Sequence, residues 1–152
     1  MKLTALVALA LTASQPYTRT IDRASKVSGV PADLVRALVT LESSWRPKAR
    51  SGAHWGLGQL RVSATARPQY LGRQRELFEP HLNLRLTVRA LSYWKAYHAT
   101  NCRGARHPYW SHYQHGTKVR SLGSGRRVGR LYRAIKARRR ARGTTLYRRL
   151  NR

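Results

Sequence analysis

The chain has 152 residues, 41% of them apolar, which suits one domain with a real core and disfavours two. Its 31 Lys and Arg residues outnumber 5 Asp and Glu residues, giving a net charge of +26 at pH 7. This charge predicts attraction to a polyanion, such as nucleic acid, anionic lipid or bacterial cell wall. Cys102 is the sole cysteine, so an internal disulfide is excluded and we expect packing alone to hold the fold.

Residues 1–16 form an apolar N-terminal segment with one early positive charge, Lys2. Its apolar stretch is too short to span a bilayer as a helix, so we expect no stable membrane span. Two interpretations remain open: a secretory signal with small residues such as Thr12 and Ser14 near the cleavage site, or a helix packed on the domain. We place the domain itself at 17–142.

Two helices are predicted next. Residues 17–28 carry apolar side chains at three-residue spacing and are followed by Gly29, which is typical of a helix end. The second helix begins at Pro31 and ends before Pro47. Its buried stripe is predicted to consist of Leu34, Leu38, Leu41 and Trp45.

Glu42 falls in the last turn of this second helix, at the border of the buried stripe. Burial and the negative end of the helix dipole both raise a carboxyl pKa, whereas the basic surface lowers it. Distant surface charges are screened, so we expect burial to dominate. Glu42 is therefore the candidate acid; the alternative is an ordinary surface glutamate at a helix end.

Residues 46–56 are predicted to form a loop, and 56–66 a further helix that ends before Pro68. The loop should bring Gln59 toward Glu42, where its amide is suited either to an amino sugar or to bracing the loop. The Ser43 hydroxyl also has two possible roles: orienting Glu42, or bonding a backbone carbonyl one turn back.

Helix is expected again over 82–99, with an aromatic trio at Tyr93, Trp94 and Tyr97 that we assign mostly to the core. Beyond it, Cys102 is followed by three histidines at spacings that do not match a standard zinc motif. We therefore expect neither a metal nor a cofactor, and interpret these histidines as surface or cleft groups. They are His107, His112 and His115.

The segment from Thr117 to Arg152 contains no acid and is rich in Arg. An apolar face of Val128, Leu131, Tyr132 and Ile135 predicts a final helix with a basic outer face. We expect a basic, frayed tail at 143–152.

Three motifs resemble the soluble lytic transglycosylase family. The string from Glu42 to Leu60 matches that family's Glu-Ser, aromatic, Pro, Ala, Ser, Gly-Ala and Gly-Leu-x-Gln pattern. Leu77-Phe78-Glu79-Pro80 with Leu82-Asn83-Leu84 is similar to its Leu-Phe-Asp-Pro and Asn-Ile segment, and Tyr113-Gln114-His115-Gly116 to its Tyr-Asn-x-Gly. The resemblance covers roughly residues 17–135. Gly58 stands where the family usually has Met, and Gln114 where it has Asn.

The resemblance implies a mainly α, lysozyme-like fold and a peptidoglycan-cleaving activity. Glu42 would protonate the oxygen between N-acetylmuramic acid and N-acetylglucosamine and then act as base toward the muramyl C6 hydroxyl, giving 1,6-anhydromuramic acid. The resemblance also implies substrate contacts for Ser43, Gln59 and Tyr113, and a structural turn at Glu79. Trp55 and Trp110 are candidates to stack on sugars in the groove.

Acidic residues are scarce after Glu42, where only Glu76 and Glu79 follow. This favours substrate-assisted cleavage over a two-carboxylate mechanism, although a lysozyme-type hydrolase remains an alternative. Another alternative is a basic nucleic-acid-binding virion structural protein on the same scaffold. We expect either a bacteriophage virion protein acting in the host periplasm and wall, with phage structural proteins as partners and non-specific DNA contact, or a secreted or periplasmic bacterial protein.

Overall fold

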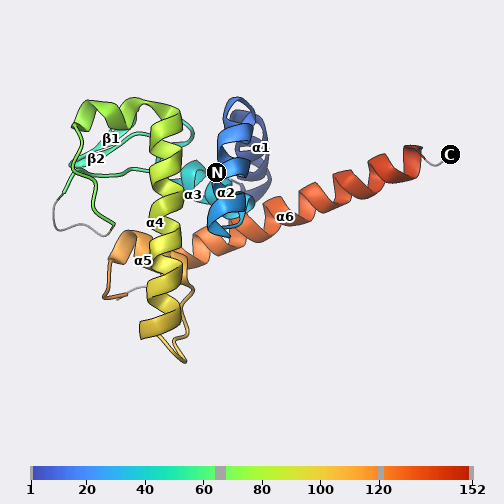
Figure 1. Cartoon of the computed structure of the whole chain (residues 1–152). Helices are drawn as coiled ribbons and strands as arrows, with labels where there is room; N and C mark the ends of the chain where they lie inside the picture. Colours follow the sequence, from blue (N-terminus) through green and yellow to red (C-terminus); the bar gives the residue numbers. More distant parts are fainter. Residues whose placement is uncertain (1, 64–67, 120–121, 151–152) are drawn as a thin grey trace.

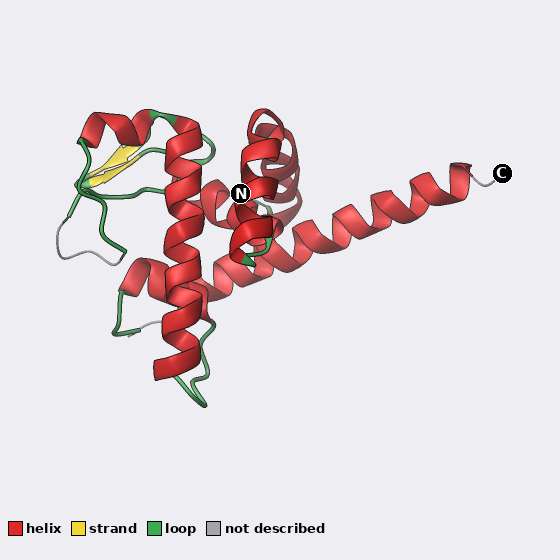
Figure 2. Ribbon diagram, in the orientation of Figure 1, coloured by secondary structure: helices red, strands yellow, loops and turns green. Residues whose placement is uncertain are grey.

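The computed structural model describes residues 2–63, 68–119 and 122–150. It is mainly helical, with one small two-stranded sheet (Figures 1 and 2), as the predicted fold class requires. The elements are α1 (Leu3–Ala13), η1 (Gln15–Tyr17), α2 (Thr18–Ser28), α3 (Ala32–Ser43), β1 (Arg50–Ser51), β2 (His54–Trp55), η2 (Gln74–Phe78), α4 (Pro80–Asn101), η3 (Tyr109–Ser111), α5 (His112–His115) and α6 (Gly123–Leu150).

Helix α3 is the centre of the core. All seven residues from Leu34 to Thr40 are buried, because α1, α2 and α6 each pack against this helix. The helix before it, α2, ends at Gly29 with a positive φ of 65°, which confirms the predicted stop. Pro31 is the N-cap of α3 rather than its first residue.

The N-terminal segment forms helix α1, whose Ala10 and Leu11 are buried. This helix packs against α3 and α6, in line with the interpretation of a packed N-terminal helix. Removal of the segment as a signal stays a prediction. None of the described helices combines the length and apolar character needed to cross a bilayer.

Helix α6 continues to Leu150, so the prediction of a frayed tail from 143 onward is wrong for 143–150. A glycine inside a helix costs about 1 kcal/mol relative to alanine, and the single Gly143 does not break this one. Figure 1 shows the C-terminal half of α6 extending away from the other helices. Residues 151 and 152 lie outside the described part of the chain.

The helix predicted over 56–66 is also wrong for the residues that the structure describes. Trp55 and Leu60 instead exchange two backbone hydrogen bonds, from Trp55 N to Leu60 O at 2.7 Å and from Leu60 N to Trp55 O at 3.0 Å. Gly56 has φ of 74° and Gln59 has φ of 50°, and these left-handed conformations reverse the chain instead of continuing a helix. Residues 64–66 lie outside the described ranges.

Asn83, on α4, holds this turn in place. Its Nδ2 donates to Trp55 O at 3.0 Å and to Leu77 O at 2.8 Å, while its Oδ1 accepts from Gly58 N at 2.7 Å. The side chain is fully buried. One amide therefore ties the turn after β2 to η2 and α4.

Two glycines are required for this close approach. A Cβ on Gly56 would lie 2.1 Å from Leu77 O, and one on Gly58 would lie 2.0 Å from Thr87 Oγ1. The second clash shows that a side chain at position 58 would displace Thr87.

We predict that Asn83→Ala lowers the free energy of unfolding by about 3 kcal/mol or more, because three backbone groups lose a hydrogen bond to a buried amide. Asn101→Ala is the matched control, since the Asn101 side chain is exposed and bonds only its own helix, at Tyr97 O. It should change stability by about 0.5 kcal/mol or less. Urea denaturation of both variants tests this, and equal losses would contradict it.

Candidate active site

Glu42 lies at the abrupt end of α3. The next two residues, Ser44 and Trp45, have positive φ values of 50° and 63°, which is costly for residues other than glycine. Trp45 is held there by burial, by a 2.9 Å bond from its Nε1 to Thr40 Oγ1, and by stacking on Tyr17 at 5.9 Å. The helix therefore ends at the edge of the core, and Glu42 in its last turn is half-buried.

A cavity of about 270 Å³ surrounds the Glu42 side chain. It is lined by Glu42, Ser51, His54, Gln59, Tyr113 and Gln114. An adjoining hollow of about 610 Å³ shares His54, Gln59, Tyr113 and Gln114 with this cavity, and extends to Trp94 and Lys118. Together they form a cleft between the turn after β2, the helix α5 and the end of α3.

Burial raises the pKa of the Glu42 carboxyl above its ordinary value. A hydrogen bond from Gln114 and the positive charges of His54 and Arg127 oppose this rise without cancelling it. Gln114 Nε2 donates to Glu42 Oε1 at 2.5 Å. The direction agrees with the sequence-based expectation, whereas Gln114 itself was not selected from sequence; its position after Tyr113 in the third motif was the available signal.

Two of the other acids are used in ion pairs. The buried Arg36 contacts Asp22 at 3.0 Å and Asp33 at 3.4 Å, and Asp33 also contacts Arg139 at 2.9 Å. A buried guanidinium needs such partners to offset its loss of hydration. These two carboxylates therefore stabilise the helix packing and are not free for catalysis.

The remaining two acids organise the chain before α4. Glu76 accepts hydrogen bonds from Tyr70 OH and Arg73 N, and these lower its pKa. Glu79 is the N-cap of α4 and accepts from His81 N and Leu82 N. Burial acts to raise the pKa of Glu79, but the two backbone donors outweigh it and the net shift is downward. The structural role predicted for Glu79 is thus confirmed.

Gln59 lines the cavity with Glu42, as the sequence predicts. Its Nε2 donates to Ala49 O at 3.2 Å and to Gly56 O at 2.9 Å. Both amide protons thus brace the loop, and the carbonyl oxygen is the group left for a ligand. Ser43 is buried, and its hydroxyl donates to Val39 O at 3.2 Å. Of the two predicted roles, the structure has the bond to a backbone carbonyl one turn back.

Tyr113 lies between Glu42 and the turn after β2. Its hydroxyl donates to Gly58 O at 2.7 Å. Burial, and then the nearby Glu42 carboxylate, raise the Tyr113 pKa, so the phenol stays protonated. Its one proton is donated to Gly58 O, so the hydroxyl oxygen is the group left to accept a hydrogen bond at the edge of the cavity.

Neither tryptophan considered as a sugar platform lines the cavities around Glu42 among the described residues. Trp55 packs against Phe78, with ring centroids 5.0 Å apart, and lies under the Arg50 guanidinium. Trp110 donates from Nε1 to Gly125 O at 3.0 Å and joins the core. Both are placed to support the fold near the cleft.

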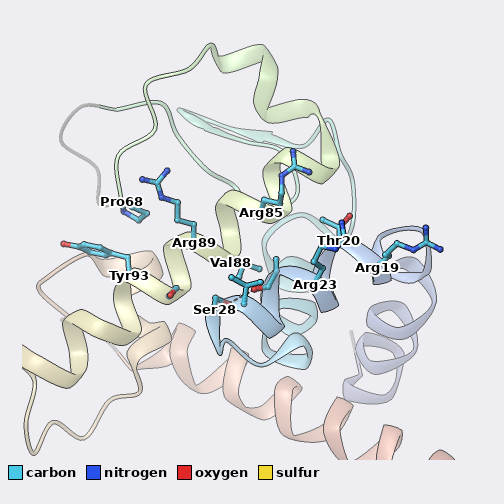
Figure 3. A pocket seen from close by; sticks show the side chains of 12 residues that line it. Arg19, Thr20, Arg23, Ser28, Pro68, Arg85, Val88, Arg89 and Tyr93 are labelled. Carbon is cyan, nitrogen blue, oxygen red and sulfur yellow. Dashed lines mark hydrogen bonds between the residues drawn. The ribbon is translucent and has the colours of Figure 1, made fainter.

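A larger hollow of about 790 Å³ lies elsewhere, between α2 and α4 (Figure 3). Four arginines line it: Arg19, Arg23, Arg85 and Arg89. No carboxylate lines this hollow among the described residues, so it has no group to donate a proton to a glycosidic oxygen. It shares only Pro68 with the cleft beside Glu42.

The interpretation of the histidines as surface or cleft groups is wrong for His112, which is fully buried. His115 does line the cleft, and its Nε2 lies 3.0 Å from Ser124 Oγ. His112 instead gathers with Cys102, His107 and a fourth residue, His98, which the sequence analysis did not select.

The Transglycosylase SLT domain family matches residues 19–110. The chain belongs to this family. The family consists of lytic transglycosylases that act on the glycosidic bonds of peptidoglycan, and the protein is an enzyme of this kind. No curated protein and no solved structure matches the chain.

The match contains Glu42, Gln59 and the Asn83 network, and it ends before Tyr113 and Gln114. The geometry nevertheless connects the matched segment to α5, because Gln114 contacts Glu42 and Tyr113 contacts Gly58. The cleft around Glu42 is thus completed by residues beyond the matched segment.

We predict that Glu42 titrates above 4.5 and that Glu76 and Glu79 titrate below it. The chain has only three glutamates, so ¹³C-carboxyl NMR of glutamate-labelled protein resolves them, with Glu42→Gln as the assignment. At low salt, Arg127→Gln should move the Glu42 midpoint further up, because an attractive positive charge is lost.

Arg130→Gln is the matched control for Arg127→Gln. It removes the same charge from an exposed position on α6 and should leave the Glu42 midpoint nearly unchanged. A Glu42 midpoint below 4.5 would overturn the assignment of this residue as the protonated acid.

Proposed function

We propose that Glu42 is both acid and base in cleavage of the β-1,4 bond between N-acetylmuramic acid and N-acetylglucosamine. The observation that carries this proposal is the pairing of a half-buried carboxyl of raised pKa with a cleft that holds no other carboxylate among its described residues. A general acid needs a raised pKa to keep its proton, and burial shifts the pKa of Glu42 in that direction.

In the first step, protonated Glu42 donates its proton to the bridging oxygen while the bond from that oxygen to muramyl C1 breaks. The N-acetyl group of the same sugar stabilises the positive charge that develops at C1. Gln114 holds the carboxylate that results, through its N–H donor to Oε1.

In the second step, the Glu42 carboxylate takes the proton of the C6 hydroxyl as O6 bonds to C1. The product is 1,6-anhydroMurNAc, and Glu42 is protonated again for the next cycle. This route requires one carboxyl only, which fits the structural use of Asp22, Asp33, Glu76 and Glu79. A lysozyme-type hydrolase would replace O6 by water in this step.

Three residues are proposed to contact the sugar or support the acid. The Tyr113 hydroxyl oxygen and the Gln59 carbonyl oxygen belong to residues that line the cavity of Glu42, and both would accept hydrogen bonds from the sugar, because their own protons are donated inside the protein. Ser43 acts through the end of α3, because its hydroxyl bonds Val39 O inside that helix.

We place this activity in local wall degradation. One setting is a bacteriophage virion that acts on the host wall and periplasm with phage structural proteins as partners; the other is a secreted or periplasmic bacterial enzyme. The charge of +26 and the arginine-lined hollow between α2 and α4 support a polyanionic partner in either setting.

We predict that Glu42→Gln lowers the rate of peptidoglycan cleavage at least about 100-fold, the usual contribution of a general acid or base. Purified peptidoglycan is incubated with each protein, and the soluble products are identified by mass. The wild type should release anhydromuropeptides, which lack the mass of one water relative to reducing muropeptides.

Glu76→Gln and Glu79→Gln are the controls, because both remove a carboxylate outside the cleft. Each should retain the wild-type product. Reducing ends from the wild type would identify a hydrolase, loss of activity in either control would indicate a second catalytic carboxylate, and no release by the wild type would refute the proposal.

We also predict non-specific DNA contact through the basic surface. The wild type should be retained on unrelated duplexes at physiological salt and released as salt increases, because the attraction comes from counterion release. Failure to bind any duplex at that salt would remove DNA from the proposed partners.

A further inference from the structure

Four side chains with metal-ligand chemistry converge where α4 ends. They are His98 and Cys102 on the last turn of α4 and its cap, His107 in the following loop, and His112 at the start of α5. One ligand atom from each lies within 4.8 Å of all the others. We propose that these residues bind one Zn²⁺ ion, in a structural Cys-His₃ site that fixes α5 to α4.

The distances from His112 Nε2 to the other three ligand atoms fit a tetrahedral zinc site. Zinc bonds of about 2.0–2.1 Å to nitrogen and about 2.3 Å to sulfur place tetrahedral nitrogen pairs about 3.3 Å apart, and nitrogen and sulfur about 3.5 Å apart. His112 Nε2 lies 3.3 Å from His98 Nδ1, 3.2 Å from His107 Nε2 and 3.6 Å from Cys102 Sγ. These three separations need almost no adjustment to accept the ion.

The hydrogen-bond pattern of His112 points the same way. Its Nδ1 lies 2.7 Å from Gly116 O, and because a carbonyl only accepts, the ring proton sits on Nδ1. His112 Nε2 then presents a lone pair, and three other groups crowd around it. The single lone pair of His112 Nε2 can accept only one good hydrogen bond from these three groups. A cation at the centre of the four ligand atoms would instead bind a lone pair from every one of them. A backbone carbonyl on the far ring nitrogen is also the usual support of a metal-bound histidine.

The donor set selects the metal. One thiolate and three imidazoles suit zinc, and four protein ligands leave no position for substrate, which is the mark of a structural site. The His112 ring is also rigidly held, stacked on Trp94 with centroids 5.4 Å apart and at 5.3 Å from Tyr97. This part of the aromatic trio therefore forms the wall of the site.

The chain geometry explains how the ligands meet although their spacing matches no standard motif. His98 and Cys102 are four residues apart and share one face of α4. Gly104 then takes a φ of 77° and Ala105 N bonds Cys102 O at 3.0 Å, which turns the chain back. His107 and His112 return to the end of α4 from that turn.

The ion would stabilise helix α5, which forms one wall of the cleft. Helix α5 has only four residues, too few to be stable alone, and it carries Tyr113 and Gln114, which reach Gly58 and Glu42. Fixing His112 fixes the first residue of this helix. The consequence for catalysis rests on the proposed function; the binding of zinc does not.

The test uses the full chain without a histidine tag, purified from medium containing zinc, with the metal content measured by elemental mass spectrometry. We expect about one zinc per chain. After exchange for Co²⁺, we expect the intense visible bands of tetrahedral cobalt and the near-ultraviolet band of a thiolate ligand. Cys102→Ser and His107→Ala should each weaken zinc binding at least about 100-fold, since even the loss of a supporting partner costs 10- to 100-fold.

His81→Ala is the matched control, because His81 is exposed and bonds Thr20 at the other end of α4. It should bind zinc as the wild type does. Chelation of the wild type should lower its Tm and its rate on peptidoglycan, and added Zn²⁺ should restore both.

Wild type without stoichiometric zinc and without a tetrahedral cobalt spectrum would overturn the site, and this readout needs no variant to fold. Equal zinc affinity in Cys102→Ser, His107→Ala and wild type would overturn it as well. A zinc-loaded protein that releases no muropeptides would instead refute the proposed function and leave the metal site standing.

Discussion

The end of α3 is the constraint on which the site depends. This helix is buried on all sides from Leu34 to Thr40, and any carboxylate within that span would have to be neutral or paired. The chain leaves the helix through two left-handed residues, Ser44 and Trp45, a conformation that costs of order 1 kcal/mol or more each. Burial of Trp45 and its bond to Thr40 offset that cost. Glu42 is thereby fixed at the boundary between core and cleft. Partial burial raises the pKa of its carboxyl there, while the side chain still lines the cavity.

The extreme charge of the chain makes this position necessary. With a net charge of +26, positive side chains favour the ionised form of an exposed carboxylate. For Glu76, hydrogen bonds from Tyr70 and Arg73, and then the charge of Arg73, lower the pKa. Glu42 escapes this because burial acts on the carboxyl directly, whereas most of the 31 basic side chains are screened by solvent. His54 and Arg127 are the charges close enough to oppose the rise. Under the proposed function the basic surface would attract anionic polymers while Glu42 supplies the acid, so substrate attraction and catalysis would be served by separate parts of the molecule.

Local sequence patterns predict the helices and helix ends whose positions depend on neighbouring residues. The stop of α2 at Gly29, the position of Glu42 in the last turn of α3 and the long helix α4 all follow from periodicity and capping. The helix predicted from Gly56 fails, because its geometry is set by Asn83, 25 residues away from Gly58. Gln114 reaches Glu42 across 72 residues, and His98 joins His112 only because the loop after α4 turns back. Contacts of this range leave no periodic signal, and the family resemblance was the only sequence clue to Tyr113.

Helix α4 sets the distance between the two walls of the cleft. Near its N-terminus, Asn83 positions the backbone of Gly58; one turn later, Thr87 packs against the same glycine. Tyr113 in turn donates to Gly58 O. The turn after β2 is therefore held by adjacent turns of α4, and α5 is joined to that turn through Tyr113. At the other end of α4, His98 and Cys102 meet the residue that begins α5. Contacts at both ends of α4 therefore place Gln59 on one wall of the cleft and Gln114 on the other, both lining the cavity of Glu42. Preorganisation of this kind reduces the reorganisation that a general acid and its partners would otherwise undergo during the reaction.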